Sequence, residues 1–239
     1  MISVTVRNII ITGGELFNKG AQAMTFVAVD ECKKRFPDHE IYVLSEMDLR
    51  RPREEKEQYA FQFTGWYPVK FAKCQANPLL RTACLIHNGK ELKACEKLYR
   101  NCDLMIDVSG YGLGSNWGIA QTKLYVDRLF FSKAFHIPCY LMPQSFGPFN
   151  FDDKLERVTR DLPTILRWAK VICAREKDGY QGLISRYQLE NVRLLPDLVY
   201  LLKFKVKDLN CNFELLIIFD KKNNIREKFL EEIANYDIN

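Results

Sequence analysis

The fold is decided by the segment from Val4 to Met24, VTVRNIIITGGELFNKGAQAM. Its first half is rich in β-branched and apolar residues, which predicts a buried strand over Val4–Thr12. Two glycines follow, and a helical pattern then extends over Ala21–Phe36 and ends at Pro37. A strand, a glycine-rich turn and a helix in this order are typical of the first half of a parallel βαβ unit.

Apolar runs and helical segments continue to alternate along the rest of the chain, which indicates an α/β domain with a parallel sheet and helices on both faces. The helix that contains Pro163 is expected to kink there, because proline lacks the N–H that an interior helical turn needs. Further strands are predicted over Glu40–Ser45, Asp103–Ser109, Pro138–Pro143, Val171–Arg175, Val192–Pro196 and Phe213–Phe219, and further helices over Trp117–Phe135 and Lys154–Ala169.

The segment 46–101 is the least regular part of the pattern. It holds a charged loop, then a group of aromatic residues between Phe61 and Phe71, then a helix-like run. We therefore predict an irregular insertion over residues 46–101. Clustered aromatic residues beside a sheet are more typical of a core or docking surface than of a sugar platform.

Composition excludes several classes of protein. With 239 residues, 47% of them hydrophobic, the chain can bury a core and is not disordered. The net charge of +5 suits an anionic small substrate or a negatively charged membrane surface, but it is too small an excess to indicate nucleic acid binding. The eight cysteines contain no Cys-x-x-Cys pair, so no metal site is predicted. The sequence contains no signal-sequence pattern and no long apolar span, so the protein is expected in the cytoplasm. A location at the inner face of the membrane is compatible with this expectation.

Ligands of an open parallel sheet bind at the carboxyl ends of the strands, so the residues after each predicted strand form the candidate site. Glycine-rich turns follow the first and third strands, at Gly13–Gly20 and Ser109–Gly114, and allow a ligand to approach the backbone. Neither turn fits the dinucleotide or phosphate-loop fingerprint, which disfavours NAD and FAD. A guanidinium after the fifth strand, Arg175, suits a carboxylate or a phosphate, and an acid, Asp197, follows the sixth.

Five segments at these strand ends are distinctive. They are Asn18-Lys19-Gly20-Ala21-Gln22-Ala23-Met24, Asp107-Val108-Ser109-Gly110-Tyr111, Pro143-Gln144-Ser145-Phe146-Gly147-Pro148-Phe149, Ala174-Arg175-Glu176 and Pro196-Asp197. In this order and spacing they resemble the polysaccharide pyruvyl transferase family. The Gln-Ser-x-Gly-Pro-Phe segment is the most specific of them, and the resemblance extends from Val4 to Tyr200.

The resemblance implies a Rossmann-like lobe over residues 1–207, similar to the N-terminal lobe of a two-lobed GT-B glycosyltransferase, and the start of a truncated second lobe over 208–239. It implies transfer of pyruvate from phosphoenolpyruvate to a sugar as a ketal, in surface or exopolysaccharide biosynthesis. The implied partners are phosphoenolpyruvate and a lipid- or nucleotide-linked sugar, with no further cofactor. An oligomer, or a partner that supplies a second lobe, is also compatible with it.

The resemblance also assigns residues to the substrate site. Arg175 is expected to hold phosphoenolpyruvate. The cleft is expected to be shaped by Asn18, Gly20, Gly110 and Gln144, and the substrate-binding set is completed by Tyr111, Ser145 and Asp197. No catalytic residue is assigned.

Two features depart from the family pattern. Ser109-Gly110-Tyr111-Gly112 stands where many members have three glycines, and the Arg-x-His motif of the family's second lobe, expected to supply the acid, has no counterpart in this sequence. Two alternatives therefore stay open. One is a truncated, non-catalytic relative that binds a sugar or a partner, and the other is a GT-B glycosyltransferase that uses a nucleotide sugar.

Overall fold

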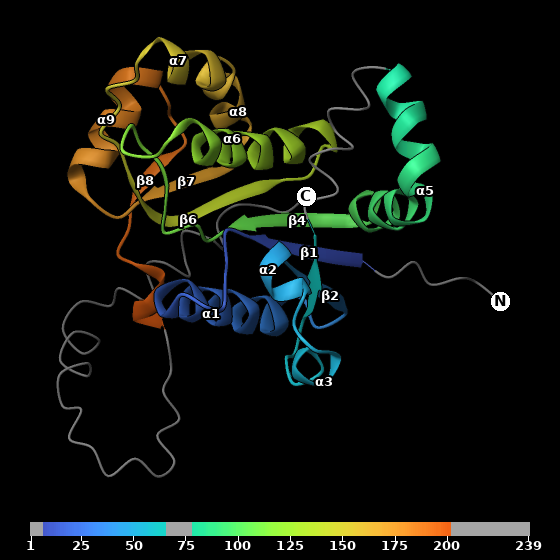
Figure 1. The fold of residues 1–239 in the computed structure, drawn as a ribbon. Coiled ribbons are helices and arrows are strands. Elements are labelled where there is room, and N and C mark those ends of the chain that lie inside the picture. The colour runs from blue at the N-terminus through green and yellow to red at the C-terminus, as the bar shows by residue number, and fades with distance from the viewer. Residues whose placement is uncertain (1–6, 66–77, 202–239) are drawn as a thin grey trace, which may run out of the picture.

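The structure, a computed structural model, describes residues 7–65 and 78–201, and its centre is a parallel sheet (Figure 1). Over these residues the sheet has eight strands, in the order β3-β2-β1-β4-β6-β7-β8, with β5 paired to the end of β6. The strands are β1 (Arg7–Thr12), β2 (His39–Leu44), β3 (Gln62–Thr64), β4 (Cys102–Asp107), β5 (Tyr111–Leu113), β6 (Cys139–Phe146), β7 (Val171–Ala174) and β8 (Val192–Leu194).

Helices cover both faces of this sheet, as Figure 1 shows. One face is covered by α1 and η1, and the opposite face by α6, α8 and α9. The helices are α1 (Lys19–Arg35), α2 (Glu46–Leu49), α3 (Arg53–Lys56), α5 (Pro78–Arg100), α6 (Ile119–Ala134), α7 (Asp153–Thr159), α8 (Leu162–Trp168), α9 (Lys177–Tyr187) and the 3₁₀ helix η1 (Leu198–Leu201). The predicted fold class, an α/β Rossmann-like domain compatible with one lobe of a GT-B-like fold, is confirmed.

The alternation of side chains along β1 divides the core into two layers. Ile9 and Ile11 pack with Met24 and other side chains of α1, while Ile10 packs on the opposite face with residues of α6 such as Leu129. All three isoleucines are fully buried. A strand with apolar residues on both faces fits only in the middle of a sheet covered on both sides, which is where β1 lies.

The predicted strands within the described ranges are present, with two informative differences. The strand predicted to end at Pro143 runs on to Phe146, because its last residues pair with β5. The helix predicted over Lys154–Ala169 is two helices, α7 and α8, and Pro163 lies in the first turn of α8. Proline is favoured at that position, so it starts a helix here rather than kinking one. The predicted strand Phe213–Phe219 and the segment 208–239 lie outside the described residues.

The segment 46–101 contains more regular structure than its sequence indicates. β3 pairs in parallel with β2 and so extends the sheet at one edge. The last turn of the long helix α5 carries Tyr99, which is buried against Phe131 of α6 with ring centroids 4.1 Å apart. In the described parts of the chain, no helix is both long enough and apolar enough to cross a bilayer.

The strand order places a crevice between β1 and β4. The connection after β1 leads towards β2 and β3 on one side, and the connection after β4 leads towards β6, β7 and β8 on the other. The two loops therefore separate at the carboxyl ends of these two strands. In open parallel sheets this reversal point is where ligands bind.

Candidate functional site

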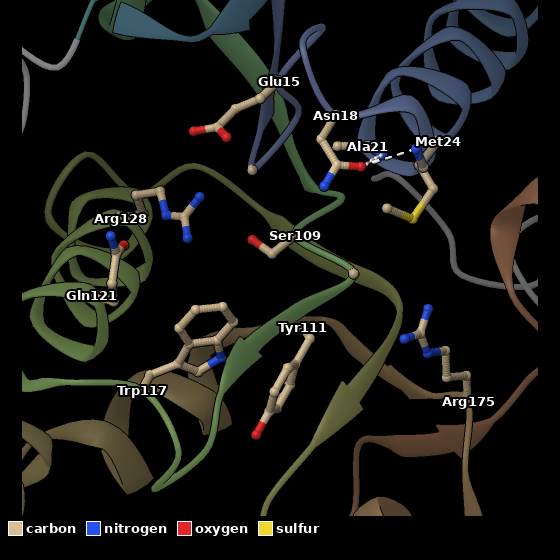
Figure 2. A pocket seen from close by; sticks show the side chains of 14 residues that line it. Glu15, Asn18, Ala21, Met24, Ser109, Tyr111, Trp117, Gln121, Arg128 and Arg175 are labelled. Atoms are coloured by element: carbon tan, nitrogen blue, oxygen red, sulfur yellow. Dashed lines mark hydrogen bonds between the residues drawn. The ribbon is translucent and has the colours of Figure 1, made fainter. Parts of the chain in front are cut away.

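A cleft of about 360 Å³ lies at this reversal point (Figure 2). Its walls come from the turn after β1, the start of α1, the segment between β4 and α6, α6 itself, and the residue that follows β7. It is lined by Gly13, Glu15, Asn18, Gly20, Ala21, Met24, Ser109, Gly110, Tyr111, Gly112, Trp117, Gln121, Arg128 and Arg175.

Asn18 forms the corner at which α1 begins. Its side-chain Oδ1 accepts hydrogen bonds from the N–H groups of Gly20, at 2.9 Å, and Ala21, at 3.2 Å. These bonds satisfy two of the amides that a helix leaves unpaired at its start. Because α1 begins at this corner of the cleft, the positive end of its helix dipole lies beside the cleft, which favours an anionic ligand.

Two glycines let the loops above β1 and β4 come together. Gly13 has φ +77°, and a Cβ there would lie 2.7 Å from the backbone nitrogen of Ser109. Gly110 has φ +66°, and a Cβ there would lie 2.8 Å from Cε of Met24. A side chain at Gly13 would need a strained backbone and would also clash with the backbone of Ser109, so the closeness of the two loops requires glycine there. At Gly110 the positive φ is the main requirement, because the end of the Met24 side chain can move.

Arg175 projects into the cleft from the end of β7 (Figure 2). Its Nε donates to Ser145 Oγ at 2.8 Å and to Glu176 Oε1 at 2.9 Å, and its Nη1 donates to Asp197 Oδ2 at 2.5 Å. Asp197 is itself fixed, because its other oxygen accepts the Val199 N–H at 3.0 Å. These bonds hold the guanidinium in one orientation, while 29% of the side chain stays exposed.

Arg128 brings a second guanidinium to the same cleft. It belongs to α6, and Figure 2 shows it on the wall opposite Arg175, with its guanidinium directed towards the centre. Its guanidinium carbon lies 5.5 Å from the centre of the Tyr125 ring, a distance at which a cation is attracted to an aromatic face. Two positive groups from different elements therefore face one open cleft.

Glu15 lies near Arg128 on the turn after β1 (Figure 2). Partial burial raises the pKa of its carboxyl group above the ordinary value, and the negative charge of Asp48 raises it further, while Arg128 lowers it. Burial is the largest of these effects, because it disfavours the charged form of the carboxyl group.

An aromatic surface forms the wall between Arg128 and Arg175. Tyr111 and Trp117 pack with ring centroids 5.3 Å apart, and the Tyr111 hydroxyl donates to the Gly147 carbonyl at 2.8 Å. Trp117 is 36% exposed, so part of its ring faces solvent at the cleft. The side chains of Ser109 and Gln121 supply polar groups beside it (Figure 2).

The comparison with known families agrees with the motifs on which this cleft is built. A family model described as polysaccharide pyruvyl transferase matches residues 18–238. The chain belongs to the polysaccharide pyruvyl transferase family. A comparison with individually curated proteins gives no match. The family match confirms the resemblance carried by the five strand-end segments.

Most of the residues expected to bind substrate in this pyruvyl transferase family member meet at the cleft. Asn18, Gly20, Gly110, Tyr111 and Arg175 line it. Ser145 and Asp197, also expected to bind substrate, contact Arg175 and fix its orientation.

Gln144 is placed differently from the rest of the expected set. It is fully buried, and its Oε1 accepts from the Tyr125 hydroxyl at 3.1 Å while its Nε2 donates to Asp107 Oδ1 at 3.2 Å. The same Asp107 oxygen accepts the Ser109 N–H at 3.1 Å. Gln144 thus supports the floor of the cleft from below rather than facing the space itself.

Sequence reasoning missed four lining residues of the transferase cleft, namely Glu15, Trp117, Gln121 and Arg128. Glu15 stands in the glycine-rich turn that the sequence had already singled out, so its position was a usable signal. The other three lie in or just before α6, away from any strand end. In the described part of the chain, no three His, Cys, Asp or Glu side chains gather closely enough to hold a metal ion.

Proposed function

We propose that this cleft binds phosphoenolpyruvate and that the protein transfers the pyruvyl group to a sugar as a ketal. The observation that carries the proposal is the pair of guanidinium groups, Arg128 and Arg175, that face one cleft at the reversal point of the sheet. Phosphoenolpyruvate carries two anionic groups, a carboxylate and a phosphate, and arginine binds both through paired N–H donors.

The start of α1 supports the same donor. Its dipole adds positive potential beside the two guanidinium groups. Stabilisation of a leaving phosphate by fixed positive groups is a principal way in which proteins promote its departure.

The aromatic wall fits the acceptor. The face of a sugar ring that carries axial C–H groups packs well on an exposed indole, and the side-chain amide of Gln121 matches the hydrogen bonding of sugar hydroxyls. Trp117 provides such an indole at the mouth of the cleft. We propose a lipid- or nucleotide-linked sugar as the acceptor, used on the cytoplasmic side of the membrane in surface or exopolysaccharide biosynthesis.

The donor site is tested by measuring phosphoenolpyruvate binding calorimetrically with Arg175→Ala and Arg128→Ala. Each variant should weaken binding by about 10- to 100-fold, which corresponds to the loss of charge-assisted hydrogen bonds worth about 1.5–3 kcal/mol. Arg186→Ala is the matched control, because Arg186 pairs with Glu156 on the surface of α9, away from the cleft.

Unchanged affinity in both cleft variants would show that phosphoenolpyruvate binds elsewhere or not at all. A thermal-shift comparison of phosphoenolpyruvate with UDP-sugars separates the proposal from a glycosyltransferase, because the true donor stabilises the folded protein by mass action. Stabilisation by a UDP-sugar alone would favour the glycosyltransferase.

A further inference from the structure

Ketal formation from phosphoenolpyruvate requires a proton at the terminal vinyl carbon, and the described cleft offers one carboxyl group that can supply it. We propose that Glu15 is the acid that protonates the donor and the base that then accepts a proton from the sugar. This inference rests on the proposed function. It goes beyond donor binding, because it assigns the proton transfers to a side chain.

The geometry of the cleft selects Glu15. Among the lining residues of the described chain it is the only carboxylic acid. The Tyr111 hydroxyl already donates its proton to the Gly147 carbonyl. His39 is bonded to Asp103 at the amino end of the sheet, at 3.0 Å, so its imidazole lies away from the reversal point.

The surroundings of Glu15 suit both directions of transfer. Burial, the largest effect, raises its pKa, and Asp48 on α2 acts in the same direction, so the protonated form persists to higher pH than in an exposed glutamate. Arg128 on α6 lowers the pKa and so stabilises the carboxylate that remains after the proton has left. A pKa moved towards the working pH is what a group that both gives and takes a proton needs.

The backbone next to Glu15 is fixed from behind. The Leu16 N–H donates to Asp48 Oδ2 at 3.0 Å, and the Ser45 hydroxyl donates to the same oxygen at 2.6 Å. Arg51 binds the other oxygen of Asp48 at 2.6 Å. This buried cluster holds the turn after β1 against α2, so the carboxyl group of Glu15 starts from a defined position.

The proton transfers balance as follows. The O–H bond of protonated Glu15 breaks, and the electron pair of the vinyl double bond forms the new C–H bond, which makes a methyl group and leaves an oxocarbenium-like carbon. A sugar hydroxyl adds to that carbon and its proton returns to the Glu15 carboxylate. The second hydroxyl displaces phosphate, which takes the second proton. The products are the ketal and inorganic phosphate, and nothing is oxidised or reduced.

The test uses the full 239-residue chain with phosphoenolpyruvate and a panel of methyl hexopyranosides in D₂O. Phosphate release and deuterium in the new methyl group are followed by NMR, and donor binding is followed by calorimetry. Glu15→Gln should lower phosphate release by at least about 100-fold. It should leave donor affinity unchanged or higher, because it removes a negative charge near Arg128. Glu15→Asp should keep intermediate activity with a shifted pH profile.

Glu46→Gln is the control, since Glu46 is an exposed glutamate in the first turn of α2. Thermal melts establish that each variant is folded. If the unmodified chain turns over and Glu15→Gln stays within about tenfold of it, the role of Glu15 is refuted and the proposed function stands. If the unmodified chain neither binds phosphoenolpyruvate nor releases phosphate, the proposed function fails and this inference fails with it. If the unmodified chain binds phosphoenolpyruvate but neither releases phosphate nor incorporates deuterium, both the role of Glu15 and the proposed pyruvyl transfer are refuted, and only the donor site stands.

Discussion

Replacing Gln144 with methionine tests the hydrogen-bonded chain beneath the cleft. Methionine keeps the length and volume of the side chain, so the cavity contribution should be small. The Tyr125 hydroxyl would lose its acceptor in a fully buried position, at a cost of about 1–3 kcal/mol. Asp107 would lose one of two hydrogen bonds to Oδ1, at a cost of about 1.5–3 kcal/mol for a charged acceptor. We therefore expect a total destabilisation of about 3–5 kcal/mol.

Urea unfolding followed by circular dichroism measures this change. Tyr125→Phe alone should cost about 1–2 kcal/mol, because it leaves the Gln144 oxygen unpaired. The double variant Gln144→Met/Tyr125→Phe has no hydroxyl left without an acceptor. Its destabilisation should therefore be smaller than the sum of the two single variants by about 1–2 kcal/mol. A cost below about 1 kcal/mol for Gln144→Met, or strict additivity in the double variant, would refute the reasoning.

Three further predictions concern the turn after β1 and the aromatic wall. Burial raises the pKa of Asp48, but hydrogen bonds from Ser45, Leu16 and Arg51 outweigh it, so the pKa is lower in the folded protein. The ionised Asp48 therefore stabilises the fold fully above its unfolded pKa of about 3.9, and this stabilisation is lost as the pH falls through its folded pKa. Asp48→Asn should therefore destabilise the protein by about 1–3 kcal/mol at pH 7. In urea titrations the difference in unfolding free energy between the variant and the unmodified protein should become smaller below about pH 4. Gly13→Ala should destabilise the protein by about 3 kcal/mol or more, because of backbone strain and overpacking. Gly89→Ala in α5, where a Cβ meets no atom within 4 Å, should instead stabilise it by about 0.5–1 kcal/mol, and equal melting temperatures of the two variants would contradict this. Trp117→Ala should raise KM for the sugar about tenfold with little change in phosphoenolpyruvate affinity, and an unchanged KM in steady-state assays would remove the indole from the acceptor site.

The strands were predictable because local composition determines them, whereas their ends depend on pairing with distant residues. β6 continues past Pro143 because Ser145 and Phe146 pair with Tyr111 and Leu113, a contact between segments that are far apart in sequence. The register with β7 shifts between Leu141 and Gln144. Proline, which cannot donate to a ladder, is tolerated at such an irregularity.

The site was predictable where it follows strand ends and hidden where a helix supplies it. Arg175 directly follows β7, so topology alone assigns it to the carboxyl edge of the sheet. Arg128 lies well inside α6, and only the packing of that helix over β4 and β6 brings its side chain to the cleft. Gln144 shows the opposite difficulty. It directly follows the strand predicted from the sequence, but in the structure it lies within β6, and its side chain points inward, towards Tyr125 and Asp107.

The central position of β1 has a consequence for synthesis of the protein. β1 is made before one of its two lateral neighbours, β4, which begins only at Cys102. At ordinary rates of translation the ribosome needs roughly 5–20 seconds to make the intervening chain. During that interval the edge of Ile9, Ile10 and Ile11 that later pairs with β4 has no partner, and an unpaired strand edge can pair with another chain. We expect slower elongation or lower expression temperature to change the yield of folded protein more than it would for a domain in which each strand pairs only with its neighbours in the sequence.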